Sequence, residues 1–265
     1  MLMKHCEVEK KVRDEIKKAA EIICQAPRTV ALTGAGISVE SGIPDFRSAG
    51  GLWERFDPME YGTIEAFRAN PEKVWTMLHE MSAVMKKAQP NPAHKGLVRL
   101  QEMGKLHHII TQNIDNLHQA AGATGVIEFH GNCKTLVCLS CDQCFGEEEI
   151  EDGLTPTCTC GTILKPNVVF FGEQIPSGTL PQAYALVSSC HVLLVVGTSA
   201  EVTPANTIPY TAKMAKAEIV EINLMPTALT ESLTDIFLQG KASEIVTELV
   251  REVERIMSQG EVTQV

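Results

Sequence analysis

Four cysteines stand in two close pairs near the middle of the chain, Cys138-Leu-Ser-Cys141 and Cys158-Thr-Cys160. Two tight turns that each present two thiolates can complete a tetrahedral zinc site, and four sulfurs leave no open position for catalysis. The chain has nine cysteines, and an odd, clustered set favours metal ligation over disulfides. We therefore expect one structural zinc ion, with Cys144 as a rival for Cys138 and Cys133 close by.

A histidine lies just before this segment, in Glu128-Phe129-His130-Gly131. Histidine is the side chain whose ordinary pKa lies near neutral pH, so it suits a general base. For an isolated histidine, a buried, hydrogen-bonded place at a strand end would be the simpler interpretation. A role for His130 can therefore be assigned only from the motifs that surround it.

A glycine-rich turn, Gly34-Ala35-Gly36-Ile37-Ser38, follows an apolar run in the first third of the chain. Such a turn lets backbone amides approach a phosphate closely. It departs from the usual dinucleotide fingerprint, because Val39 stands where the third glycine belongs. A turn that is merely structural would explain it equally well.

Short apolar runs alternate with helical patterns and would position these groups. Apolar residues recur at helical spacing from Val8 to Ile23 and again from Ile245 to Met257. Alternating strands and helices indicate a parallel, doubly wound sheet of Rossmann-like α/β class. The expected strands are Thr29 to Thr33, His107 to Thr111, Val126 to Phe129, His191 to Gly197 and Glu218 to Ile222.

Polar clusters fall at the carboxyl ends of these expected strands, which is the edge where open α/β sheets bind ligands. A series of polar strand ends is harder to explain by structure alone than any one of them. The clusters are Gly34 to Ser38, Gln112 to Asp115, His130, Gly197 to Ser199 and Asn223.

Two segments interrupt this alternation and predict a second, smaller domain. Residues 49–89 are rich in aromatic residues and methionine, and we expect a helical insertion there. Residues 137–165 carry the cysteine pairs and would form a zinc ribbon packed against it. The large Rossmann-like domain would then comprise residues 1–48, 90–136 and 166–265.

Composition narrows the class of protein. The chain has 265 residues, 44% of them hydrophobic, and a formal net charge of −10, which argues against direct nucleic-acid binding. Its longest apolar run is too short to span a bilayer, and the N-terminus has no secretory core. We expect a cytoplasmic protein with reduced thiols and no membrane association.

The ordered motifs resemble those of the sirtuins, the NAD-dependent protein deacylases, over nearly the whole chain. The resemblance implies cleavage of the nicotinamide–ribose bond of NAD and transfer of ADP-ribose to the acyl oxygen of a modified lysine. The matching segments are Gly34 to Ser38, Gly42 to Arg47, Thr111 to Asp115, Phe129 to Gly131, the cysteine segment, Pro166 to Glu173, Gly197 to Ser199 and Ile222-Asn223.

The resemblance also implies roles for single residues. His130 would be the general base, with Asn113 and Gln112 ordering the ribose and a water. Asp115 and the Ile114 backbone would hold the nicotinamide carboxamide, although Gln112 to Asp115 could equally form an Asx turn and helix cap. The remaining residues implied to bind the cofactor are Gly34, Ala35, Gly36, Phe46, Arg47, Thr198, Ser199, Asn223, Leu224, Lys241 and Ala242.

The acyl-lysine of a protein or peptide would enter between the two domains. Val169 would offer its carbonyl to the substrate amide, and Phe171 would line an apolar tunnel. Gly172 and Glu173 would pair with the substrate as an added strand. A buried strand from Val168 to Phe171 is the simpler structural alternative.

Acyl preference follows from one further comparison with the family. Sirtuins specialised for acidic acyl groups carry a Tyr-x-x-Arg pair on a small-domain helix, and here Leu78 and Met81 occupy those positions. Neither side chain can neutralise a carboxylate. We expect deacetylation in preference to desuccinylation. The alternatives are protein mono-ADP-ribosyl transfer, and a non-catalytic zinc-ribbon module with a degenerate NAD pocket.

Overall fold

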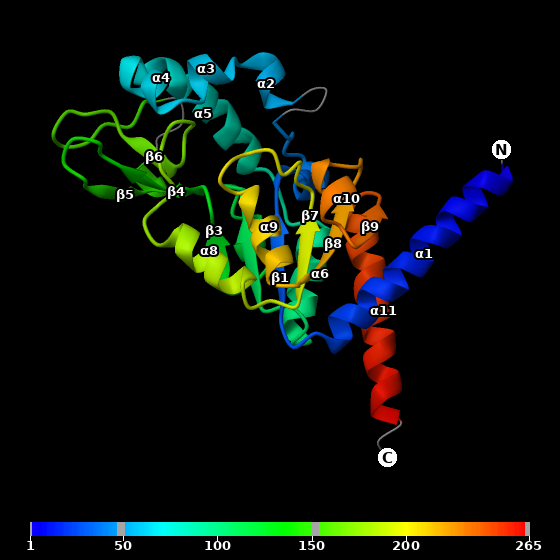
Figure 1. The fold of residues 1–265 in the computed structure, drawn as a ribbon. Coiled ribbons are helices and arrows are strands. Elements are labelled where there is room, and N and C mark those ends of the chain that lie inside the picture. Colours follow the sequence, from blue (N-terminus) through cyan, green and yellow to red (C-terminus); the bar gives the residue numbers. More distant parts are fainter. Residues whose placement is uncertain (1, 47–50, 150–153, 263–265) are drawn as a thin grey trace.

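The computed structural model describes residues 2–46, 51–149 and 154–262, with side chains omitted at 2–9, 149 and 260–262. Its centre is a six-stranded parallel sheet in the order β3-β2-β1-β7-β8-β9 (Figure 1). The strands are β1 (Thr29–Thr33), β2 (His108–Thr111), β3 (Val126–Glu128), β7 (Val192–Val196), β8 (Glu218–Asn223) and β9 (Ile236–Gln239).

This strand order runs outward in both directions from β1 and β7, as in a doubly wound dinucleotide-binding sheet. β1 pairs in parallel with both β2 and β7. The chain therefore reverses its direction of winding between β1 and β7, and the carboxyl ends of these two strands flank the switch point. Ligands of open α/β sheets bind at that point.

Helices cover both faces of the sheet, which explains the nearly continuous apolar strands. Within β1, Ala31 packs with helices on one face while Val30 and Leu32 pack on the other. The first face is covered by α1 (Leu2–Gln25), α6 (Pro92–Glu102) and α11 (Ala242–Val262), and the second by α8 (Thr179–Val187) and α9 (Thr207–Met214).

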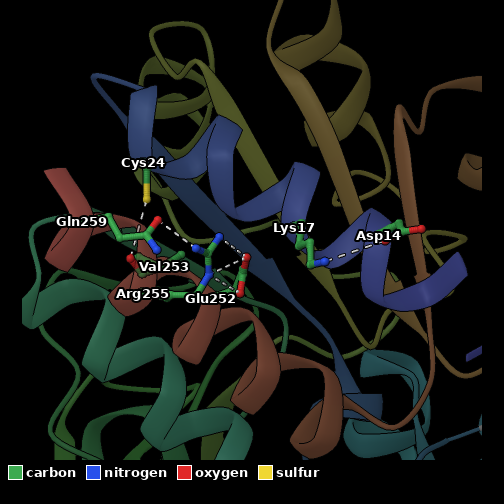
Figure 2. Close-up of polar contacts among 7 residues, drawn as sticks. All are labelled: Asp14, Lys17, Cys24, Glu252, Val253, Arg255 and Gln259. Carbon is green, nitrogen blue, oxygen red and sulfur yellow. Dashed lines mark hydrogen bonds and ion pairs between the residues drawn. The ribbon is translucent and has the colours of Figure 1, made fainter. Parts of the chain in front are cut away.

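The two longest helices, α1 and α11, cross on one side of the sheet, with the N-terminal half of α1 extending away from it (Figure 1). Figure 2 shows their contact, where the Cys24 thiol of α1 donates to the Val253 carbonyl of α11 at 3.9 Å. Arg255 binds Glu252 within α11, and a weaker pair, Lys17 and Asp14, lies along α1. These helices fit the two periodic segments seen in the sequence.

A separate small domain combines short helices with an antiparallel sheet of order β5-β4-β6 (Figure 1). The helices and this sheet share one core, in which Trp75 Nε1 donates to the Leu164 carbonyl at 2.9 Å. Its elements are α2 (Leu52–Arg55), α3 (Pro58–Tyr61), α4 (Ile64–Ala69), α5 (Pro71–Met85), β4 (Gly131–Val137), β5 (Cys144–Gly146), η3 (Glu147–Glu149) and β6 (Lys165–Val168).

Four short elements complete the described part of the chain: η1 (Ala35–Ile37), η2 (Val39–Ser41), α7 (Leu117–Ala120) and α10 (Ala228–Ser232). The expected α/β class, with a smaller zinc-ribbon and helical domain, is confirmed. The sixth strand, β9, was absent from the sequence prediction, since four residues show too little periodicity to stand out. The domain boundaries stay a prediction, and β4 runs across the one expected at residue 136. Among the described helices, none has the length and apolar character needed to cross a bilayer.

Candidate active site

The glycine-rich turn after β1 packs directly against the end of β7. Gly36 N donates to the Gly197 carbonyl at 2.8 Å, and Gly34 N donates to the Val196 carbonyl at 3.1 Å. A Cβ added to Gly36 would lie 2.8 Å from Gly197 Cα, and one added to Gly34 would lie 2.7 Å from Thr198 Cβ. Backbone contact at the switch point therefore requires these glycines, and two of the turn's amides are already engaged there.

Three polar side chains meet beside this turn. The buried Ser38 hydroxyl donates to Asp115 Oδ2 at 2.6 Å and accepts from Asn113 Nδ2 at 3.1 Å. Asn113 Nδ2 also lies 3.1 Å from the Gly34 carbonyl, and Asp115 Oδ1 accepts from Leu117 N at 2.9 Å. The Asx turn considered from sequence is thus present, and it leaves the second carboxylate oxygen joined to Ser38.

Two buried histidines, His94 and His118, pack next to this group. His94 Nδ1 accepts from Asn91 N at 3.4 Å, so its proton lies on Nε2, 3.5 Å from Ser38 Oγ. His118 Nε2 lies 2.9 Å from the Thr33 hydroxyl, and the two imidazole rings are 5.0 Å apart. Burial lowers the pKa of His94 to about 4, against the opposing effect of Asp115. Burial and the neighbouring His94 lower the pKa of His118 to about 3.

His130 is half-buried at the end of β3, where its tautomer is fixed by a backbone contact. Nδ1 lies 3.0 Å from the Gln112 carbonyl, which can only accept, so Nδ1 carries the proton. Nε2 is then the unprotonated nitrogen, as a general base requires. Burial lowers the pKa of His130, and the hydrogen bond to Gln112 partly opposes that shift.

The strand ends of β2, β7 and β8 are joined by side-chain bonds. Gln112 Nε2 donates to Thr198 Oγ1 at 3.0 Å, and Asn223 Nδ2 donates to the Thr198 carbonyl at 3.0 Å. Asn223 Oδ1 accepts from Leu224 N at 2.9 Å, while the Leu224 side chain is exposed. Ser199 follows Thr198 directly. Three residues implied by the family resemblance thus form one connected group.

The start of α11 reaches the same edge through a hydrogen bond to Glu40. Glu40 Oε2, next to the glycine turn, accepts from Ser243 N at 2.9 Å. Ala242 is buried at this helix start, and exposed Lys241 pairs with Glu244 at 3.8 Å. The structure therefore places Lys241 and Ala242 beside the segment that follows Gly34 to Ser38.

A row of aromatic rings connects the large domain to the small one. Phe46 lies 5.5 Å from Trp53, and Trp53 lies 6.2 Å from Phe171, between ring centroids. Ile114 packs against the small-domain core from the large-domain side. Arg47, expected near the phosphates, lies outside the described residues. The rings of Phe46 and Phe171 are partly exposed, so they are available to a ligand.

The segment expected to bind the acyl-lysine follows β6. Val169 N donates to the His130 carbonyl at 2.9 Å, which ties this segment to the candidate base. Phe171 forms a parallel bridge with Thr63 of the helical insertion. Gly172 has a φ of +85°, and the Glu173 carboxylate is held by Phe170 N at 2.8 Å. Any contact of Glu173 with a peptide would therefore come from its backbone.

The four cysteines of the two pairs gather at one point of the ribbon. Their sulfurs all lie within 4.8 Å of one another, with Cys138 Sγ 3.5 Å from Cys160 Sγ and Cys141 Sγ 3.6 Å from Cys158 Sγ. Tetrahedral zinc with four thiolates would separate its sulfurs by about 3.8 Å. The donor set fits zinc, and Cys144 lies outside this group, with its thiol 3.8 Å from the Asp142 carbonyl.

Sequence reasoning missed three contributors to this site. His94, His118 and Trp53 were assigned no role, because each is a single residue of a type that is often simply core. Asn91-Pro92 before His94 marks a helix start, but nothing in that signal points to Ser38. Only the fold brings His94 and His118 to the switch point, and Trp53 between Phe46 and Phe171.

Comparison with known proteins gives matches along nearly the whole chain. A family model described as the Sir2 family matches residues 34–204. The chain is 43% identical over 254 residues to an NAD-dependent protein deacylase of Archaeoglobus fulgidus, covering 94% of this chain and 100% of the relative. It is 41% identical over 249 residues to one of Thermococcus kodakarensis, covering 91% and 96%.

Solved structures agree with these matches. A Sir2 homologue in complex with NAD matches with a TM-score of 0.85 and 42% identity, covering 90% of this chain and 94% of that one. A Sir2 protein with a deacetylated p53 peptide and acetyl-ADP-ribose matches at 0.84 and 34%, covering 89% and 98%. Another, bound to a myristoylated histone peptide, matches at 0.80 and 38%, covering 93% and 99%.

Proposed function

The chain belongs to the Sir2, or sirtuin, family of NAD-dependent protein deacylases, and we propose that it acts on acetyl-lysine in preference to lysines with acidic acyl groups. NAD is the co-substrate, and zinc serves the fold of the ribbon. The observation that supports this preference most directly is the apolar pair Leu78 and Met81 in the small-domain core.

His130 is the general base of this proposal. Its Nδ1–H is held by the Gln112 carbonyl, which leaves Nε2 free to take a proton from a ribose hydroxyl. NAD supplies the electrophilic ribose carbon to which the acyl oxygen becomes joined when nicotinamide leaves. Because burial lowers the pKa of His130, the neutral and therefore basic form prevails throughout the neutral pH range.

Asn113 and Asp115 bind the ribose and nicotinamide sides of NAD in this account. Ser38 fixes both through its single hydroxyl, so neither must be ordered when the ligand arrives. Gly34 to Gly36, Thr198, Ser199 and Asn223 would contact the phosphates and adenosine ribose, with Leu224, Lys241 and Ala242 near the adenine. Phe46 covers the reacting face, where an apolar ring excludes water.

The acyl-lysine lies against Val169 and Phe171. Relatives bind p53 and histone peptides, and backbone pairing along such a segment accepts many sequences. We propose protein or peptide substrates with acetyl-lysine, and some tolerance of longer apolar chains such as the myristoyl group of one relative. A cytoplasmic location remains a prediction from the sequence.

The acyl preference rests on the local chemistry of α5. Leu78 is 6% exposed and belongs to the buried small-domain core, and Met81 is half-buried and packs against that core, as Phe56 and Ile114 do. A succinyl carboxylate placed there would lose water without gaining a cation, at a penalty of several kcal/mol. An acetyl group has no such carboxylate to desolvate.

The test compares acetyl- and succinyl-lysine versions of one peptide. We expect kcat/KM for acetyl-lysine to exceed that for succinyl-lysine by about a hundredfold or more, as an unpaired buried carboxylate requires. Comparable turnover of the two peptides would refute the preference. The double substitution Leu78→Tyr and Met81→Arg should lower the ratio of kcat/KM for acetyl-lysine to kcat/KM for succinyl-lysine. Val84→Tyr, at an exposed site on the same helix, should leave this ratio unchanged.

A further inference from the structure

An ion pair between a buried lysine and a half-buried glutamate lies next to the segment that follows β6. Lys165 is 4% exposed, and its ammonium is 3.1 Å from Glu173 Oε2. The same ammonium donates to the Val168 carbonyl at 2.7 Å and lies 5.0 Å from the centre of the Phe170 ring. Burial lowers the pKa of Lys165, and Glu173 opposes that shift. Neither side chain has a part in the chemistry described above.

The pair closes a turn around Phe171. Glu173 Oε2, which binds Lys165, also accepts from Phe170 N at 2.8 Å, and Glu173 N donates to the Phe170 carbonyl at 3.0 Å. Gly172, with its φ of +85°, allows the chain to reverse within this span. One carboxylate oxygen therefore binds both a backbone amide of the turn and the ammonium at the start of β6.

The turn is connected on both sides to parts of the active site. Val169 N donates to the His130 carbonyl at 2.9 Å. Phe171 N donates to the Gly62 carbonyl at 2.9 Å, and Ile64 N donates to the Phe171 carbonyl at 3.0 Å. A change in the turn would thus move Phe171 relative to both His130 and the helical insertion.

We propose that Lys165 and Glu173 are positioning residues for the acyl-lysine substrate, holding Val169 and Phe171 in the binding conformation before the peptide arrives. This inference rests on the proposed function, in which the peptide lies against those two residues. A segment ordered in advance loses less conformational freedom on binding. The ion pair therefore acts on peptide affinity more than on the chemical step.

A purely structural role would have different consequences. Removing one partner of a buried ion pair leaves an uncompensated charge, whereas removing both restores much of the stability. If the pair only stabilised the fold, its loss would lower the melting temperature without selective change in peptide binding. The positioning role predicts a change in peptide KM while kcat and the KM for NAD stay constant.

The experiment uses the zinc-bound protein with Glu173→Gln, Lys165→Met and the double variant, below the melting temperature of each. We expect each single change to raise peptide KM about tenfold, which corresponds to about 1.4 kcal/mol of binding free energy. The kcat and the KM for NAD should stay within about twofold of the wild-type values. The double variant should be no worse than the worse single variant, since the two groups act as one unit. Lys73→Met removes an exposed lysine paired with Glu60 in the same domain and should match wild type.

Direct binding of a fluorescent acetyl-lysine peptide separates this inference from the proposed function. Weaker binding in both single variants, with a coupled double variant, supports the positioning role. Unchanged peptide affinity and KM in the variants would overturn it while leaving the deacylase activity intact. Independent, multiplying effects would also contradict it, and a wild-type protein that neither binds nor turns over the peptide would overturn both proposals.

Discussion

The NAD side and the peptide side of the site are held by different interactions. At the sheet edge, short polar side chains and backbone contacts, such as Gly36 N to Gly197 O and Ser38 to Asp115, lie inside a large apolar core. On the peptide side, a small core is supplemented by a four-cysteine cluster and by Lys165 with Glu173. We infer that the first side is rigid by packing and the second depends on metal and charge.

The largest expected effect is that of zinc removal. Chelation verified by metal analysis should abolish peptide turnover, because structural zinc contributes to the folding of small domains. NAD affinity should fall by less than about tenfold, since the sheet core does not contain the zinc site. On one sample, calorimetry measures the stability of the fold, an NAD titration measures NAD affinity, and the peptide assay measures turnover.

Serine substitutions at two different cysteines provide the control for that experiment. Cys158→Ser should lose zinc and turnover, whereas Cys144→Ser should retain both, because the Cys144 sulfur lies outside the cluster. Full turnover by protein shown to be free of zinc would contradict the dependence of the peptide side on metal.

Next in size is a substitution at the switch point. Gly36→Ala would bring a methyl group within 2.8 Å of the Gly197 backbone, which cannot yield easily, so we expect a loss of about 2–4 kcal/mol in unfolding free energy. Gly42→Ala, with a φ of +87° but nothing within 4 Å, should lose only about 1 kcal/mol. Urea denaturation of the two variants would show equal losses if backbone contact were unimportant.

A smaller effect concerns pH and tests whether the sheet edge needs neutral histidines. His94 and His118 have folded pKa values of about 4 and about 3, below the ordinary value of 6.5. Their contribution to stability is therefore complete above pH 6.5 and is lost as the pH falls from 6.5 toward these values. Each histidine should add about 1.4 kcal/mol per pH unit to the slope across that range.

Denaturation midpoints measured between pH 7 and pH 4 check this slope. His118→Asn should lower the slope by about 1.4 kcal/mol per pH unit, the contribution of one proton, while His191→Asn, at an exposed position, should leave the slope unchanged. A slope that stays the same in the His118 variant would show that the buried pair does not control acid stability.

The sequence predicted the sheet well because its strands are mostly apolar and end in polar clusters. Thr29 to Thr33 and Glu218 to Ile222 were located within a residue of β1 and β8. The cysteine spacing likewise predicted the cluster, since two close pairs need little help from the rest of the chain. The short β9 carried too few residues for its periodicity to be recognised.

The contacts that support the site could not be predicted from the sequence. For Gly34 and Gly36 the sequence left phosphate approach and a merely structural turn open, and the structure adds their close packing against Gly197 and Thr198. Lys165 was assigned no role from the sequence, because its burial depends on the positions of Phe170 and Glu173 in the fold. Such contacts are set by tertiary packing, which residue type and spacing do not record.

The most direct test of this account measures nicotinamide and O-acetyl-ADP-ribose from NAD and an acetyl-lysine peptide. Wild-type protein should form both in equal amounts, with an acid limb in kcat/KM below pH 6.5, because the pKa of His130 is lowered by burial. His130→Ala should reduce turnover by about 10²–10⁴, the usual contribution of a general base, while His191→Ala should match wild type. Full turnover by the His130→Ala variant, or nicotinamide release with ADP-ribosylated protein and no acetylated product, would contradict it.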